Sequence, residues 1–282
     1  MIPATFEYVR AGSVDEAVAA LAEHGDDAKV LAGGHSLLPL MRLRLAAPEV
    51  LVDVGRVDAL KGVSDGGDAL SIAAGTTHHE VMHDPLVRQH CGVLAHVTAT
   101  VGDPQVRHRG TIGGSVAHGD AAGDLPAALV ALDATLVAQG PSGQREIPAS
   151  QFFVDYLTTS LGSDEVLVEI RVPRLGDDWA WQYEKMNRVA QGWAIVGALA
   201  MVRRSNGSIE EARVGLTNMG TVPVRASATE AALAGAPTDA IAAAADEADE
   251  GTDPPGDLNA TPEFRRHLAR VLTRRALQAA AG

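Results

Sequence analysis

The spacing of hydrophobic and polar residues predicts a chain of short strands and helices. After Ser13, which has the spacing of a capping box with Glu16, apolar residues recur at helical intervals until Gly25. Apolar segments of strand length stand before and after this helix. The N-terminal part is therefore expected to form a β-α-β-turn-β lobe that ends near residue 57, with strands at 6–9, 29–31 and 50–54.

A second group of elements is expected between residues 58 and 177. Apolar runs of strand length occur at 70–75, 135–138 and 166–170, and helix-like runs occur at 93–101 and 125–132. The segment from Pro173 to Asp178 holds proline, glycine and two acids, which is typical of a boundary.

The residues from 178 to 282 differ from the preceding parts in that strands come first and alanine-rich helices follow. Three strands are expected, with Asn206-Gly207 as a hairpin turn between the last two. From Arg225 the chain is rich in alanine and predicted to be helical, and Thr261 caps a last helix at 262–280. The three strands are expected at 181–185, 194–203 and 212–217. The fold class is therefore α+β, in three parts at 1–57, 58–177 and 178–282, and the last part is an antiparallel sheet with helices.

Composition narrows the function classes. The net charge is −13, which argues against nucleic acid or an anionic membrane surface as partner. The longest apolar run, 193–202, is too short to span a bilayer, and the first residues lack the pattern of a signal peptide, so a cytoplasmic location is expected. A single cysteine, Cys91, excludes an intrachain disulfide and a cysteine-ligated iron–sulfur cluster within this chain.

Two glycine-paired motifs are the strongest functional signal. Adjacent glycines allow positive φ, so that successive backbone N–H groups converge on one point, and a following hydroxyl adds a donor. Two such turns suit the two phosphates of a dinucleotide held between two lobes. The motifs read Ala32-Gly33-Gly34-His35-Ser36 and Thr111-Ile112-Gly113-Gly114-Ser115.

Other interpretations of these motifs stay open at this point. No lysine stands beside either motif as a P-loop requires, and the Rossmann pattern of three spaced glycines is missing. Each glycine pair on its own is more often a structural turn than a phosphate site. The chain could accordingly be an electron-transfer flavoprotein subunit, a self-sufficient flavin enzyme, or a binding module without catalysis.

Three further residues could contact a cofactor, each with a simpler alternative. Asp124 could accept hydrogen bonds from sugar hydroxyls or cap the helix that follows it. Trp193 could stack on an aromatic ring or pack in the core as the first residue of an apolar strand. Lys185 could contact an anionic flavin or point to solvent.

The histidines at 78, 79 and 83 could in principle bind a metal ion. The chain shows no clear second group of ligands, so no metal site is expected and the segment is interpreted as a polar helix face. No catalytic base or nucleophile pattern is found, and no catalytic residue is assigned.

Four segments together resemble the FAD-binding medium subunit of molybdenum hydroxylases, and within that family the aerobic carbon monoxide dehydrogenases. The resemblance extends over nearly the whole chain and includes Tyr183-Glu184-Lys185 and Gly215-Leu216-Thr217-Asn218. It implies a two-lobed FAD-binding domain of the vanillyl-alcohol-oxidase type and a separate C-terminal α+β domain. The four segments are Ala-Gly-Gly-His-Ser-Leu-Leu-Pro from Ala32, Gly-Asp-Pro-Gln-Val-Arg from Gly102, Gly-Thr-Ile-Gly-Gly from Gly110 and Asp-Leu-Pro-Ala from Asp124.

The resemblance also implies roles for single residues. Both glycine motifs would hold the pyrophosphate of FAD. Thr77, Gly102 and Asp124 would contact the sugar and ribityl portions, and Lys185 and Trp193 would lie at the isoalloxazine. Two positions depart from the family pattern, because many relatives have asparagine where Ser115 stands and tyrosine where Trp193 stands.

Such a subunit works inside a complex. The resemblance implies a large partner with molybdopterin that oxidises the substrate and a small partner with two [2Fe–2S] clusters, in a dimer of heterotrimers. The flavin would pass electrons to an external acceptor. Carbon monoxide is favoured as substrate by the resemblance alone, with aldehydes and N-heterocycles as alternatives.

Overall fold

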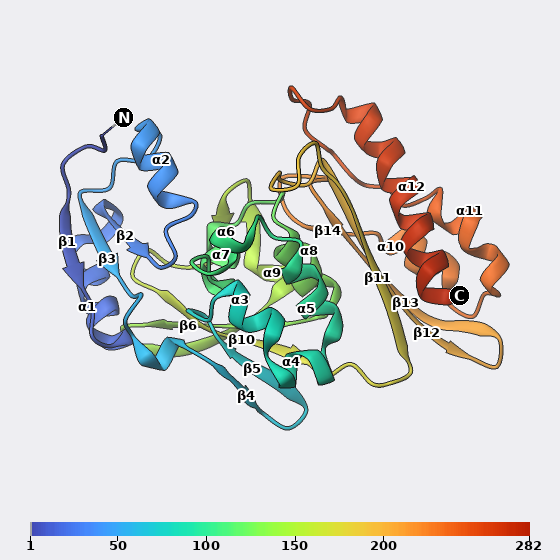
Figure 1. Cartoon of the computed structure of the whole chain (residues 1–282), viewed down its shortest axis with the longest axis horizontal. Coiled ribbons are helices and arrows are strands. Elements are labelled where there is room, and N and C mark those ends of the chain that lie inside the picture. The colour runs from blue at the N-terminus through green and yellow to red at the C-terminus, as the bar shows by residue number, and fades with distance from the viewer. Residues whose placement is uncertain (1) are drawn as a thin grey trace.

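The computed structural model describes residues 2–282 and contains three main sheets that succeed one another along its long axis (Figure 1). In Figure 1 the N-terminal residues lie on the left, the middle of the chain in the centre, and the C-terminal residues on the right. Each main sheet is built from one continuous stretch of chain, which agrees with a two-lobed N-terminal region followed by a separate α+β part.

The first sheet is parallel and has the order β1-β3-β2. Ser13 caps α1 by accepting a hydrogen bond from Glu16 N, but the Glu16 carboxylate binds Gly12 N at 2.7 Å, so the predicted capping box is incomplete. Gly25 ends the helix with φ 56°. The elements are β1 (Glu7–Arg10), α1 (Val14–His24), β2 (Ala28–Leu31), α2 (Leu37–Leu43) and β3 (Val50–Asp53).

The central sheet is antiparallel with the order β4-β5-β10-β6-β7, and helices α3 to α8 accompany it. Every residue of α8 is buried, because this helix lies between the central sheet and the third one. The strands are β4 (Val63–Asp65), β5 (Ala69–Ala73), β6 (Thr135–Gly140), β7 (Gly143–Pro148) and β10 (Val166–Pro173). The helices are α3 (His78–His83), α4 (Pro85–His90), α5 (Gly92–Ala99), α6 (Pro104–Arg107), α7 (Ile112–His118), α8 (Asp124–Ala131) and α9 (Ala149–Phe152), and a ribbon pairs β8 (Phe153–Asp155) with β9 (Thr158–Thr159).

The third sheet is antiparallel with the order β11-β12-β13-β14, and α12 packs against β11 and β12. The hairpin turn is the predicted one, since Asn206 and Gly207 have φ of 52° and 84° between paired Ser205 and Ser208. The elements are β11 (Trp179–Met186), β12 (Val196–Ser205), β13 (Ser208–Thr217), β14 (Val224–Arg225), α10 (Ser227–Leu233), α11 (Ile241–Ala245) and α12 (Pro262–Ala281). Short 3-10 turns lie at Gly25–Asp27, Asp58–Leu60 and Thr238–Ala240.

The three parts share their cores. The core of the first lobe includes Val137, Val166 and Val168 of the central sheet, and the central core includes Tyr183 and Leu199 of the third sheet. The parts are thus packed on one another by buried apolar side chains. Within residues 2–282, no helix has both the length and the apolar character required to cross a bilayer.

Candidate functional site

The first glycine motif, residues 32–36, forms the turn between β2 and α2. Gly34 has φ +77°, and a Cβ there would lie 2.8 Å from Leu38 Cδ1, so a side chain is disfavoured on both grounds. Within residues 2–282, no hydrogen bond uses the backbone N–H groups of residues 32 to 36. Ser36 stands at the N-cap of α2 without a side-chain capping bond. The motif therefore presents a run of free donors.

The second glycine motif is the start of a helix, and the predicted turn with positive φ is wrong there. Thr111 caps α7 by accepting a hydrogen bond from Gly114 N at 3.0 Å. Gly113 N donates to Ala74 O at 2.8 Å, and a Cβ on Gly113 would lie 2.6 Å from that same oxygen. Glycine is needed there because the helix approaches the end of β5 closely. Ile112 N and Ser115 N also have protein acceptors, Thr76 O and Thr111 O.

The structure brings the two motifs together. A Cβ on Gly33 would clash with Arg109 O and lie 2.8 Å from Gly110 Cα, so only glycine fits against the chain that leads into the second motif. A Cβ on Gly114 would lie 3.8 Å from the Ala32 Cβ. The motifs adjoin, but only residues 32–36 offer a run of unused N–H groups.

Thr77 lies next to the second motif but has its hydroxyl engaged. It forms an isolated antiparallel bridge with Thr111. Thr77 Oγ1 donates to Glu80 Oε2 at 2.7 Å and accepts from Glu80 N at 3.2 Å, in a complete capping box at the start of α3. Its predicted contact with a sugar stays a prediction.

His78 is a residue whose significance the sequence did not reveal. Its side chain is 3% exposed, and Nδ1 has no hydrogen-bond partner within residues 2–282. Burial lowers the pKa of His78 from 6.5 to about 4, with further lowering by His35 and Arg107. Because His35 belongs to the first motif and His78 N donates to Gly110 O, this imidazole lies between the two motifs. No pattern around position 78 distinguished it from its neighbours.

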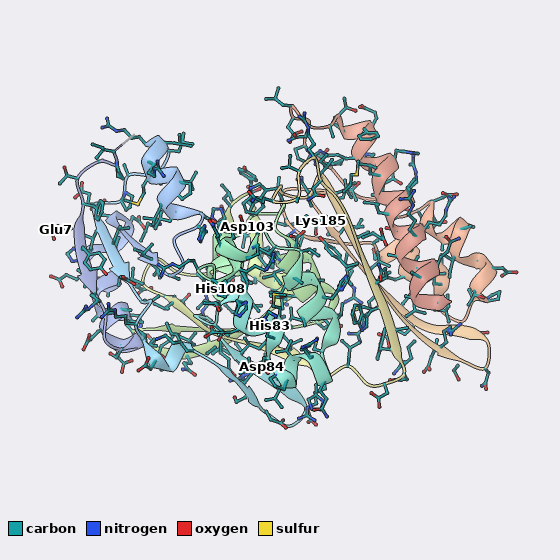
Figure 2. All side chains as sticks on the ribbon, in the orientation of Figure 1. Glu7, His83, Asp84, Asp103, His108 and Lys185 are labelled. Carbon is teal, nitrogen blue, oxygen red and sulfur yellow. The ribbon has the colours of Figure 1, made fainter. Side chains whose placement is uncertain are left out.

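His79 and His83, which were considered and rejected as metal ligands, lie near a third histidine, His108. The His79 ring lies 3.8 Å from the His108 ring and 4.4 Å from the His83 ring, measured between centroids, and Figure 2 shows His83 and His108 in the central part of the molecule. Among residues 2–282 no three His, Cys, Asp or Glu side chains are arranged to hold a metal ion.

Asp124 and Lys185 form a buried ion pair. Asp124 Oδ2 accepts from Lys185 Nζ at 2.7 Å, and Oδ1 accepts from the Tyr183 hydroxyl at 2.6 Å. Burial raises the pKa of the Asp124 carboxyl, and the Lys185 ammonium opposes that shift. Lys185 Nζ also donates to Thr100 O at 3.1 Å. Asp124 is the first residue of α8 and its N-cap is Gly123, so the interpretation of Asp124 as a helix cap is wrong, as is that of Lys185 as a solvent-directed lysine.

Trp193 lies in the connection between β11 and β12 and is 59% exposed. The expected strand at 194–203 begins only at Val196, so both the strand position and the core position of Trp193 are wrong. Gln191 of the same connection donates to Asp103 Oδ2 at 2.8 Å. Asp103 follows Gly102, whose φ is +51° and whose missing Cβ leaves room for Val106.

The predicted residues thus form two neighbouring clusters. One joins the two glycine motifs with Thr77. The other contains Gly102, Asp124, Lys185 and Trp193, linked through Thr100, Asp103 and Gln191. Figure 2 shows Asp103 and Lys185 close to the centre of the molecule. An anion beside the free N–H groups and a flat ring beside the exposed indole fit this arrangement.

Comparison with known proteins places the chain in a family. A model described as the FAD binding domain in molybdopterin dehydrogenase matches residues 4–175, and one described as the CO dehydrogenase flavoprotein C-terminal domain matches residues 181–280. The chain belongs to this family of flavoprotein subunits. It is an FAD-dependent oxidoreductase subunit of the molybdenum hydroxylase type, and the resemblance carried by the four sequence segments is confirmed.

Relatives match over their whole length. The medium chain of carbon monoxide dehydrogenase from Hydrogenophaga pseudoflava is 41% identical, over 99% of this chain and 98% of its own. Subunit alpha of the 6-hydroxypseudooxynicotine dehydrogenase complex from Paenarthrobacter nicotinovorans is 36% identical, over 98% and 95%. A solved structure of the Hydrogenophaga enzyme superposes with a TM-score of 0.97 at 43% identity, covering 99% of this chain and 98% of that one. The α+β fold class, with an FAD-binding part and a C-terminal part, is confirmed.

Proposed function

We propose that this chain is the medium subunit of an aerobic carbon monoxide dehydrogenase, where it binds one FAD noncovalently between its glycine motifs and its C-terminal domain. FAD, when bound, would supply a carrier that receives electrons from [2Fe–2S] clusters of a small partner and yields them to an external acceptor. A large partner with molybdopterin would oxidise the substrate. The observation that supports this most is the run of free N–H groups at 32–36, held against the second motif in a chain of this family.

The pyrophosphate is assigned mainly to the first motif. Backbone N–H groups from Ala32 to Ser36 have no acceptor in the protein, and such a run is suited to phosphate oxygens. The second motif uses most of its N–H groups internally, so its proposed contribution is the Ser115 hydroxyl and the close packing of Gly113 and Gly114. Thr77 and Gly102 are assigned to the sugar portions from the family pattern.

The isoalloxazine is assigned to the cluster around Lys185. The indole of Trp193 is exposed and so has an uncovered face for stacking. The ammonium of Lys185 is held in place by Asp124 and Thr100 O, which would keep a positive charge beside a flavin ring. In this assignment Asp124 acts on the ribityl end and on the orientation of Lys185.

The clusters that deliver electrons have to lie on a partner. The single cysteine of the chain, Cys91, is fully buried, and burial raises the pKa of its thiol to about 12. Iron–sulfur ligation needs several thiolates. A self-sufficient dehydrogenase of the same fold is the second candidate, but no residue of the site has been assigned as a catalytic base.

The substrate is assigned by similarity. Relatives with nearly full-length matches include a carbon monoxide dehydrogenase medium chain and a subunit of the 6-hydroxypseudooxynicotine dehydrogenase complex, at 41% and 36% identity. Carbon monoxide is preferred because that match has the higher identity, with aldehydes and N-heterocycles as alternatives. The three-part division at 1–57, 58–177 and 178–282, the dimer of heterotrimers and the cytoplasmic location belong to the same proposal.

A matched pair of variants tests the pyrophosphate assignment. Ser36→Asp places a carboxylate beside the free N–H groups, whereas Ser36→Asn has nearly the same size and no charge, and both residues are good N-caps for α2. We expect Ser36→Asp to weaken FAD binding at least roughly tenfold, because a carboxylate repels phosphate, and Ser36→Asn to weaken it much less. Titration of the apoprotein with FAD measures this, and equal affinities for the two variants would overturn the assignment.

A further inference from the structure

Asn218 connects two segments that are far apart in the sequence. It follows β13 and has φ 62°, a left-handed conformation that asparagine tolerates better than most residues. Its backbone N–H donates to Ala121 O at 2.7 Å. Its side-chain Nδ2 donates to Ala194 O at 2.8 Å and to Ile195 O at 3.3 Å.

Each connected segment carries a residue of the proposed flavin site. Ala121 lies three residues before Asp124, whose carboxylate holds Lys185. Ala194 directly follows Trp193. The side-chain amide of Asn218 therefore links the loop before Asp124 to the residues that follow Trp193, beside the backbone bond from Ile195 N to Met186 O at 2.7 Å.

The segment of Trp193 is held at both ends. Before the indole, Gln191 donates to Asp103 Oδ2 at 2.8 Å. After it, the buried guanidinium of Arg265 donates to Ile195 O, beside the amide of Asn218. The Trp193 side chain itself is 59% exposed and stacks on no other ring within residues 2–282. Its backbone is anchored while its ring is left uncovered.

We propose that Asn218 is a positioning residue for the isoalloxazine end of FAD, fixing the indole of Trp193 relative to the pair of Asp124 and Lys185. The proposal rests on the proposed FAD site. A residue with a purely structural role at the end of β13 would need only the left-handed backbone, which glycine provides. The side-chain amide is required only if the Ala194–Ile195 segment has to be held at one distance from the loop before Asp124.

The test uses two equivalent substitutions. Asn218→Gly keeps the left-handed backbone and the N–H to Ala121 O, and removes the amide. Asn206→Gly makes the same change at the other end of β13, in the hairpin turn with φ 52°, and serves as control. The purified chain is titrated with FAD and, separately, with ADP, which has the pyrophosphate but no isoalloxazine.

We expect Asn218→Gly to weaken FAD binding roughly tenfold, because two hydrogen bonds that order the ring end are lost, and to leave ADP binding unchanged. Asn206→Gly should change neither. Equal weakening for FAD and ADP, or no change for either, would overturn the positioning role. If the unmodified chain binds no FAD at all, the proposed function itself fails, so the two failures are distinguishable.

Discussion

At the scale of single residues, adjacent glycines of the first motif satisfy different requirements. Gly34 has a positive φ, so it is needed for its conformation. Gly33 lacks that conformation, and is needed because the backbone of Arg109 and Gly110 occupies the space of a side chain. Gly33 is therefore needed for the contact between the first lobe and the second motif. Gly34 is needed for the backbone conformation of the segment 32–36 that carries the free N–H groups.

Gly33→Ala should destabilise the protein by about 2 kcal/mol, because the new methyl group has only backbone atoms to displace. Gly220→Ala is the control, since a Cβ there meets nothing closer than 3.4 Å. Urea unfolding measures both. A Gly33→Ala variant as stable as the Gly220→Ala variant would show that the two motifs do not pack as described.

His78 should make stability depend on pH. Its pKa is about 4 in the folded protein and 6.5 ordinarily, so between these values the unfolded chain binds more protons and unfolding is favoured as the pH falls. The stability that depends on neutral His78 is fully present above pH 6.5, and about 2 kcal/mol of it should be lost at pH 5. His78→Phe removes this titration. Between pH 7 and pH 5 the free energy of unfolding of the variant should therefore fall by about 2 kcal/mol less than that of the unmodified protein. Identical losses in urea unfolding would contradict the buried, neutral state of His78.

At the scale of elements, prediction succeeded where the signal is local. The helix after Ser13 and the turn at Asn206-Gly207 were predicted from capping and turn residues that act within a few positions. The second glycine motif was wrongly predicted as a turn, because the close approach of Gly113 to Ala74 is made by a distant strand. No local pattern reports such a contact.

The candidate site shows the same difference between local signals, which the sequence carries, and long-range contacts, which it does not. Asp124 and Lys185 were named as possible cofactor contacts from the sequence, and the family resemblance favoured that role. Their ion pair joins residues of α8 and β11, which a local sequence pattern cannot bring together. Trp193 was placed in a strand because the apolar run 193–202 continues without interruption through the end of the connection. The burial of His78 was not predicted, because it belongs to a polar segment whose other histidines, His79 and His83, are more exposed.

Trp193→Ala tests the role of the β11–β12 connection. Because the side chain is 59% exposed, its loss should change the free energy of unfolding by less than about 1 kcal/mol. FAD affinity should fall roughly fivefold and the visible flavin spectrum should shift, because the stacking face is removed. Val189→Ala, at an equally exposed position of the same connection, is the control. An unchanged flavin spectrum together with a large loss of stability would return Trp193 to a packing role.

At the scale of the whole molecule, the shared cores decide how the cofactor site is held. The central sheet contributes to the core of the first lobe, and helices α5 and α8 of the central part pack against the third sheet. Both clusters of the site are therefore attached to the same central part. The residues proposed for the pyrophosphate and those proposed for the isoalloxazine are thereby joined through buried apolar side chains. This arrangement suits a carrier of electrons with a firmly held cofactor.

The proposal that this chain carries electrons without oxidising the substrate itself is tested by anaerobic spectroscopy. Carbon monoxide is added to the FAD-loaded chain alone and to the chain assembled with its molybdopterin and iron–sulfur partners, and the flavin absorbance is followed. The account predicts that the absorbance stays constant in the chain alone and is bleached in the assembled complex. Bleaching by carbon monoxide, an aldehyde or an N-heterocycle in the chain alone would contradict it and establish a self-sufficient dehydrogenase.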